Sequence, residues 1–359
     1  MPRKIDIDEF SDDTPMEAGH PDNLMMVDKS TRIVVPNKFP TLTGFPYRIA
    51  LIGEAPGQNE VQQGEPFVGM SGQLLSALLG KANIIREACF IGNVCQLRPP
   101  NNDIELFARN GPEITAGLRQ LKEDLDRFKP NICVLLGKTA LWAALGDDKI
   151  GNWRGSLFKS QHHLPGWKCL ASYHPAAVLR QYEWRPVLAM DLIKAYKEGH
   201  FPELRLPERR LVIDYTPDQI VVECQRIQKE KLKVAVDIEG GIGTMSCVSV
   251  ATSADYAFII PFTKIDGSNY YENTDTEIKV WRAMAELLED PEVPKILQNA
   301  LYDRFVLQYS YNIVLQGTID DTMLKWWEMY CELEKSLGFQ ASVLTNEPYW
   351  KYERKMSQL

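Results

Sequence analysis

Apolar residues along the chain form two successive patterns of strands and helices. From residue 46 to about 198, short apolar runs alternate with stretches whose apolar residues recur every three or four positions, and these spacings are typical of buried strands and amphipathic helices. The strands are predicted near 47–52, 88–95, 131–136 and 168–173, and the helices near 72–82, 112–128, 138–145 and 186–197. Strands that alternate with helices indicate an α/β fold, a doubly wound parallel sheet with helices on both faces.

A second pattern begins after a proline-rich, charged linker at 201–210. Its strands are predicted near 211–214, 232–239, 246–252, 256–261 and 295–298, and its helices near 217–230, 277–289 and 301–310. Strands in direct succession indicate a second α/β domain with a mixed sheet, at 211–359. Residues 1–45 show no sustained period and include an acidic run, which predicts a disordered N-terminal arm before the first domain at 46–200.

Composition adds a charge asymmetry to this organisation. The 359 residues are 45% hydrophobic and 25% charged, typical of a soluble globular protein of two domains. We find no apolar run that could span a bilayer and no signal peptide, so we expect a cytoplasmic protein of a bacterial or phage-infected cell with no membrane partner. The net charge of −8 divides into roughly −3 for residues 1–45, +3 for 46–200 and −8 for 201–359. Only the first domain therefore offers a basic face for nucleic-acid phosphates.

The segment from Gly53 to Leu75 concentrates polar groups between a predicted strand and a predicted helix. It reads G-E-A-P-G-x-x-E, three residues, then G-x-P-F-V-G-x-x-G-x-L-L. A turn in this position places its side chains at the carboxyl edge of a parallel sheet, where α/β folds bind ligands. Neither phosphate-binding glycine motif is present. Glu54, Glu60 and Phe67 instead offer two carboxylates and an aromatic face, which suit a flat neutral ring.

Two later segments strengthen this interpretation. Gly92-Asn93-Val94 is followed by Arg98-Pro99-Pro100, and a third segment reads S-Y-H-P-A-A-V-L-R at 172–180. In this order the three motifs resemble those of the family 4 type uracil-DNA glycosylases. The resemblance implies a uracil-DNA glycosylase-like fold and an enzyme that excises uracil extruded from DNA.

The resemblance also implies residue roles. Glu54 would position water beneath the sugar, Asn93 would pair with uracil N3–H and O4, and His174 would donate to uracil O2 as charge builds on the base. Phe67 would stack on the base. Glu60 would crowd the thymine methyl. The backbone around Gly69 and Ser71, and the segment from Pro175 to Arg180, would contact phosphates and wedge the DNA helix open, and Gly53 is a further candidate substrate contact.

The cysteines depart from the family pattern. Family 4 enzymes carry four cysteines for an iron–sulfur cluster, two in an N-terminal CxxC and one directly before Arg-Pro-Pro. Here that last position is Leu97, Cys95 lies two residues early and no cysteine precedes Cys89. The seven cysteines are odd in number and scattered, which is typical of reduced core thiols. We therefore predict a glycosylase with no cofactor and no cluster.

The second domain has a different set of candidate ligands. Asp237 and Glu239 form D-x-E, and Asn299 to Asp303 read N-x-x-x-D. These resemble the first two motifs of the 3′-5′ exonuclease domain of polymerase I type DNA polymerases, a ribonuclease H-like fold. The resemblance implies that Asp237, Glu239 and Asp303 bind Mg or Mn. The third motif, Y-x-x-x-D, is matched only by Tyr349 to Glu353, with Glu for Asp, so we expect a truncated domain with weak or absent hydrolysis.

The favoured hypothesis is a uracil-DNA glycosylase fused to an incomplete exonuclease domain, as at the front of a phage polymerase. Two alternatives stay open. The protein could be a non-catalytic module that grips DNA or uracil and tethers a separately encoded DNA polymerase, or it could be an active metal-dependent exonuclease.

Overall fold

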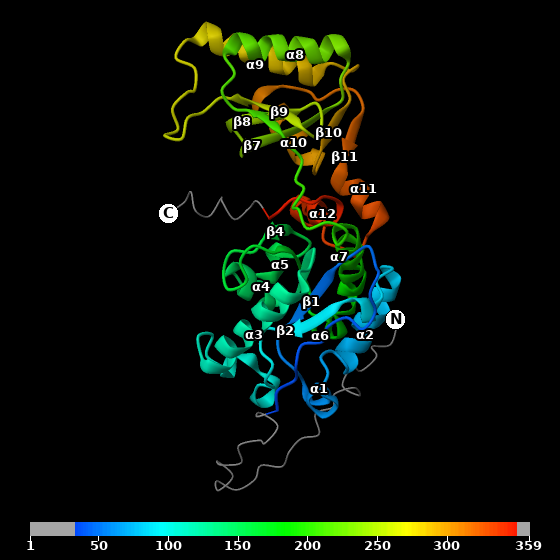
Figure 1. Ribbon diagram of the computed structural model, residues 1–359. Coiled ribbons are helices and arrows are strands. Elements are labelled where there is room, and N and C mark those ends of the chain that lie inside the picture. The colour runs from blue at the N-terminus through cyan, green and yellow to red at the C-terminus, as the bar shows by residue number, and fades with distance from the viewer. Residues whose placement is uncertain (1–32, 350–359) are drawn as a thin grey trace, which may run out of the picture.

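The computed structural model describes residues 33–349 and consists of two α/β halves, each with its own sheet (Figure 1). The first half spans residues 33–209 and the second spans 210–349. The α/β class predicted for both halves is confirmed.

The first sheet has the strand order β2-β1-β3-β5-β4. Its strands are β1 (Ile49–Gly53), β2 (Phe90–Asn93), β3 (Ile132–Leu136), β4 (Leu157–Lys159) and β5 (Lys168–Ser172). The four predicted strands pair in parallel, and β4 pairs antiparallel to β5. The prediction of a wholly parallel sheet is therefore wrong at this edge, because a three-residue strand is too short to show a period.

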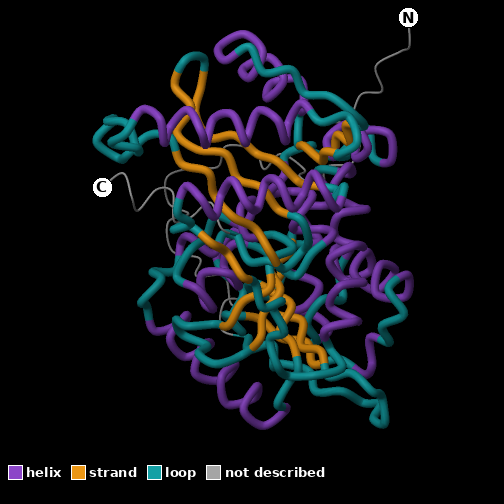
Figure 2. The backbone as a smooth tube through the Cα atoms, turned by 90° about the horizontal axis from the view of Figure 1, so that it is seen from above, coloured by secondary structure: helices purple, strands orange, loops and turns teal. Residues whose placement is uncertain are grey.

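Helices cover both faces of this sheet, as predicted. Figure 2 shows the strands of the two halves running through the molecule with helices on either side of them. Ala50 and Ile52 pack in one core with α3 (Pro112–Phe128) and α4 (Lys138–Leu145). Ile49 and Leu51 point the other way because neighbouring residues of a strand face opposite sides. They pack with α2 (Met70–Lys81) and α7 (Arg185–Glu198). Shorter helices are α1 (Gln58–Gln63), α5 (Ile150–Trp153), α6 (Pro175–Arg180), η3 (Arg86–Ala88), η4 (Pro100–Asn102), η5 (Ile104–Leu106) and η6 (Tyr182–Trp184).

Residues 33–45 differ from the predicted disordered arm. Val34 and Lys38 form antiparallel bridges with Leu97 and Ile91, and Val35 is only 1% exposed. The reason is the free edge of β2, whose unpaired backbone groups offer partners to this segment. The prediction is wrong for these residues, and the rest of the arm, residues 1–32, lies outside the described residues.

The second sheet is mixed, as predicted, with the order β11-β10-β7-β8-β9-β6. Its strands are β6 (Arg210–Val212), β7 (Val234–Gly241), β8 (Thr244–Ala251), β9 (Tyr256–Pro261), β10 (Lys295–Leu297) and β11 (Ile319–Asp321). The helices α8 (Pro217–Glu230), α9 (Thr274–Glu289) and α10 (Ala300–Tyr311) share a core with the sheet.

Two further helices, which periodicity did not predict, lie between the halves. They are α11 (Thr322–Met329) and α12 (Leu337–Leu344), and Figure 1 shows α12 beside α7. Trp326 of α11 packs with Val187 of α7 in a small separate core. The chain thus returns to the first half after completing the second sheet. Within residues 33–349, no helix is both long and apolar enough to cross a membrane.

Candidate active site

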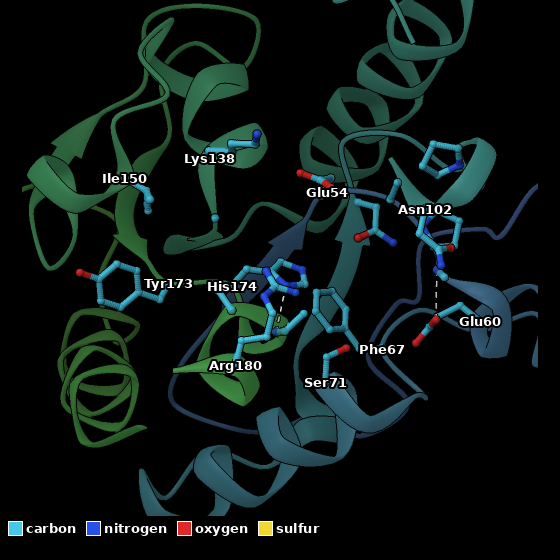
Figure 3. Close-up of a pocket in the computed structure, with 18 of the residues that line it drawn as sticks. Glu54, Glu60, Phe67, Ser71, Asn102, Lys138, Ile150, Tyr173, His174 and Arg180 are labelled. Atoms are coloured by element: carbon cyan, nitrogen blue, oxygen red, sulfur yellow. Dashed lines mark hydrogen bonds between the residues drawn. The ribbon is translucent and has the colours of Figure 1, made fainter. Parts of the chain in front are cut away.

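A cavity of about 470 Å³ opens where the strands of the first sheet end. Glu54 follows β1, Asn93 ends β2 and His174 follows β5, and all three line this cavity with Phe67. Figure 3 shows Glu54, Phe67 and His174 around it. Parallel strands bring their carboxyl ends to one edge, so residues more than a hundred positions apart meet there. The predicted convergence of the three motifs is therefore observed.

The loop that carries Phe67 is held in a constrained conformation. Phe67 has a φ of 56°, in the left-handed region that few side-chain-bearing residues adopt. The Arg86 guanidinium donates to the Phe67 carbonyl at 2.8 Å, and Glu60 accepts from the backbone N–H groups of Val68 and Gly69 at 3.0 and 2.8 Å. Glu60 also accepts from the Gly57 N–H at 3.1 Å. Its carboxylate therefore holds the loop, a role for which the motif gave no signal.

Asn93 presents an unused acceptor to the cavity. The residue is 3% exposed, and its Oδ1 has no hydrogen-bond partner among the described residues. A Cβ at Gly53 would lie 2.6 Å from this atom and 2.5 Å from the Phe67 ring. Glycine at this position therefore permits both side chains to approach the strand end closely. A buried unpaired carbonyl is costly, so a ligand with an N–H group is expected to pair with it.

His174 is oriented by the helix that it caps. Its Nδ1 accepts from the Ala176 N–H at 3.1 Å at the start of α6, so the neutral ring carries its proton on Nε2. Burial, reinforced by the positive charge of Arg180 and opposed by Glu60, lowers the pKa of His174 to about 4. The ring is therefore neutral near pH 7. Its centroid lies 5.7 Å from that of Phe67, so a donor and an aromatic face share the cavity.

Glu54 is positioned by a residue that the sequence interpretation missed. The hydroxyl of Thr139, in the first turn of α4, donates to the Glu54 carboxylate. Gly137, which precedes α4 with a φ of 94°, permits this turn. The signal available in the sequence was a Gly-Lys-Thr after β3, at the same sheet edge as the three motifs.

Most predicted site residues line the cavity. These are Glu54, Glu60, Phe67, Ser71, Asn93, His174 and Arg180. Gly53, Gly69 and Pro175 do not line it but shape its walls, Gly69 and Pro175 at the starts of α2 and α6. Lining residues that no motif indicated include Asn102, Lys138, Ile150 and Trp184.

In the second half, the predicted metal ligands Asp237 and Glu239 lie two residues apart on β7, and Asp303 lies on α10. Asp303 is 5% exposed, and burial, followed by the charges of Asp237 and Asp321, raises its pKa to about 6. Among the described residues, however, no three His, Cys, Asp or Glu side chains are grouped so that they could hold a metal ion. The fit to Mg or Mn is therefore incomplete.

The third exonuclease motif is absent from this carboxylate site in the part that is described. The Tyr349 ring packs on Trp153 of the first half, with the ring centroids 5.7 Å apart. Glu353 lies outside the described residues.

The cysteines nearest the sheet do not suit an iron–sulfur cluster. Cys133 and Cys169 are buried partners on β3 and β5. Cys89 and Cys95 are also buried, and each thiol donates to a nearby backbone carbonyl, that of Ile85 and that of Leu97 respectively. Leu97 pairs with Val34 where the family has a cysteine. The described thiols do not fit the cluster.

Comparison with known proteins divides the chain in the same way as the fold. A model of the uracil DNA glycosylase superfamily matches residues 42–195, and a model of the 3′-5′ exonucleases matches residues 212–347. The type-4 uracil-DNA glycosylase of Pyrobaculum aerophilum is 34% identical over 156 residues, which are 42% of this chain and 78% of the relative. That of Sulfurisphaera tokodaii is 34% identical over 180 residues, 48% of this chain and 77% of the relative. The crystal structure of the Aedes aegypti Nibbler EXO domain is similar over 42% of this chain and 75% of the Nibbler chain, at 17% sequence identity and a TM-score of 0.32.

Proposed function

The chain belongs to the type-4 uracil-DNA glycosylase family, and we propose that its first half hydrolyses the bond between uracil and deoxyribose in DNA. The observation that carries the proposal is the buried, unpartnered Oδ1 of Asn93, which shares one cavity with Phe67 and His174. Uracil presents an N3–H donor between two carbonyls, and cytosine has no proton at N3. The acceptor therefore favours uracil.

The geometry supports a separate role for each of the four side chains in the cavity. The base leaves the stack and lies against the Phe67 ring, while Asn93 pairs with N3–H and O4. The Nε2–H of the neutral His174 donates to O2 as negative charge develops there. Glu54, held by Thr139, offsets the positive charge that develops on the sugar and orients the attacking water. No step requires a group that this half does not contain.

Release of free uracil tests this function directly. A uracil-bearing oligonucleotide, single- or double-stranded, is incubated with the folded protein in EDTA and then cleaved with alkali at the abasic sites. We expect cleavage at uracil and none at cytosine or thymine. Uracil-specific binding without release would favour the alternative of a non-catalytic module.

We propose further that the glycosylase works without an iron–sulfur cluster, in contrast to its family. The seven cysteines of the chain include no CxxC pair, and Leu97 occupies the position before Arg-Pro-Pro. We expect purified protein to contain far less than one iron cluster per chain, to lack visible absorbance and to keep its activity in Cys95→Ala. Stoichiometric iron that is lost with activity in this variant would contradict the proposal.

The second half carries an exonuclease domain, and this match favours weak metal-dependent exonuclease activity as a second candidate function. We expect Mg or Mn to support slow shortening of a single-stranded 3′ end or none. Rapid shortening that disappears in Asp237→Ala would instead establish an active exonuclease, and uracil release in EDTA would be unaffected by that result.

Three finer expectations complete the proposal. The first domain is proposed to end at residue 200 and to include residues 33–45, which pair with it, with a linker at 201–210 and the second domain from 211. We propose a cytoplasmic setting in a bacterial or phage-infected cell and a DNA polymerase as partner, on the motif resemblance of the second half. Copurification with a polymerase subunit tests the last point.

A further inference from the structure

Helix α12 follows the exonuclease carboxylates in sequence but is bound by the glycosylase half. Phe339 and Val343 of α12 pack in a cluster with Tyr173, Val187 and Trp326. Ser342, in the same helix, is 7% exposed. The helix therefore fills an interface between the halves (Figure 1).

Four residues, which we call the α12 clamp, make a buried polar cluster in this interface: Arg154, Asp191, Lys194 and Ser342. Arg154 is 2% exposed, and its guanidinium donates to Asp191 at 2.9 Å and to the Ser342 hydroxyl. It also lies over the Phe339 ring, 4.5 Å from the centroid. Lys194 donates to the carbonyls of Gly155, Ser342 and Thr345.

The close approach of the two halves depends on Gly155. This residue has a φ of 75°, and a Cβ there would lie 2.5 Å from the Ser342 carbonyl oxygen. A buried ion pair is stable only when its remaining hydrogen-bonding groups are satisfied. Ser342 supplies one of the acceptors that the buried Arg154 needs, so the pair depends on a residue of the other half.

The clamp continues to the loop that carries His174. The second oxygen of Asp191 accepts from the Ser172 hydroxyl at 2.6 Å. Ser172 is fully buried, ends β5 and lies two residues before His174. Tyr173, between them, lines the cavity and packs in the same apolar cluster as α12. The start of the His174 loop is thus fixed by groups whose own positions depend on α12.

We propose that α12 of the exonuclease domain is a positioning element of the glycosylase pocket, acting on the His174 loop through Arg154, Asp191 and Ser172. This proposal rests on the proposed function. Ser342 is a positioning residue because it touches neither substrate nor the reacting atoms.

The test compares Ser342→Ala with Ser253→Ala in the full chain. Ser253 is an exposed serine of the second half whose hydroxyl donates to Asp255 of the same half, so its variant controls for a general effect on that half. In Ser342→Ala we expect kcat for uracil release to fall about tenfold, the factor that one hydrogen bond to a charged group supports, with KM nearly unchanged. Phe339→Ala, which removes the ring beneath Arg154, should have a similar effect.

Hydrogen exchange measured by mass spectrometry separates this role from a loss of folding. We expect amides of residues 172–178 to exchange faster in Ser342→Ala and Phe339→Ala, while those of β7 to β9 exchange at the wild-type rate. Unchanged exchange at 172–178 in both variants would overturn the proposal. Because exchange is measured without substrate, this outcome is independent of whether the wild-type protein releases uracil.

Discussion

Replacing Asn93 with alanine is expected to lower the rate of uracil release about 10²- to 10³-fold, because two hydrogen bonds to the base edge are lost and each is worth about 1–3 kcal/mol at a buried site. The side chain is 3% exposed and its Oδ1 has no other partner in residues 33–349. Removing it therefore breaks no bond that the described fold makes, so the thermal unfolding temperature should change little. Single-turnover kinetics on a uracil-bearing strand measure the effect.

Two companion variants test the reason for this loss. Asn152→Ala changes an exposed asparagine of α5 and should keep the wild-type rate. Asn93→Asp places a second oxygen where an amide donor faces uracil O4, so it should lose uracil activity and favour cytosine, whose 4-amino group is a donor. A wild-type rate in Asn93→Ala would exclude base recognition at this position.

His174→Ala is expected to reduce kcat about 10²- to 10³-fold, the cost commonly found when one donor to a developing anion is removed. Its Nε2–H is the donor because Nδ1 is already engaged by the Ala176 N–H. His174→Gln, which keeps an N–H group, should lose less. His162→Ala serves as the control because His162 is exposed and lies outside the lining of this cavity. Equal rates for wild type and His174→Ala would exclude the assigned role.

The pKa of His174 predicts how this contribution depends on pH. Burial lowers that pKa to about 4, so the neutral ring is present at every pH well above this value. The ratio of wild-type to His174→Ala rates should stay constant from neutral pH down to about pH 5 and fall as the pH approaches 4. Below that pH a proton on Nδ1 would face the Ala176 N–H and break the cap. Since the folded pKa lies below the unfolded value, His174 also stabilises the fold above about pH 6.5, and this stability is lost progressively down to pH 4.

Much of the glycosylase site follows from local patterns in the sequence. The strands before Glu54, Asn93 and His174 are short apolar runs, and parallel pairing alone brings their ends to one edge. The role of Glu60 could not be predicted in the same way. Its motif position indicates proximity to the base, but only the folded loop shows that its oxygens are taken up by three backbone N–H groups.

The contacts that sequence reasoning missed are those between residues far apart in the chain. Arg154 and Ser342 are 188 positions apart, and neither belongs to a motif or to a clear periodic pattern of apolar residues. The strand β4 has only three residues. Residues 33–38 pair beside the outer edge of β2, and that edge exists only once the sheet has formed. Such features depend on tertiary packing, which local propensity does not encode.

The chain returns to the glycosylase half after the second sheet, so the exonuclease domain is attached to the first half at both of its ends. The chain leaves the glycosylase half after α7 and returns to it at α12, and hydrogen bonds from Arg154 and Lys194 hold α12 there. A domain tethered at one end can reorient freely about its linker, whereas one fastened at both ends tumbles with its neighbour. We therefore expect the two sites to keep a fixed separation in solution.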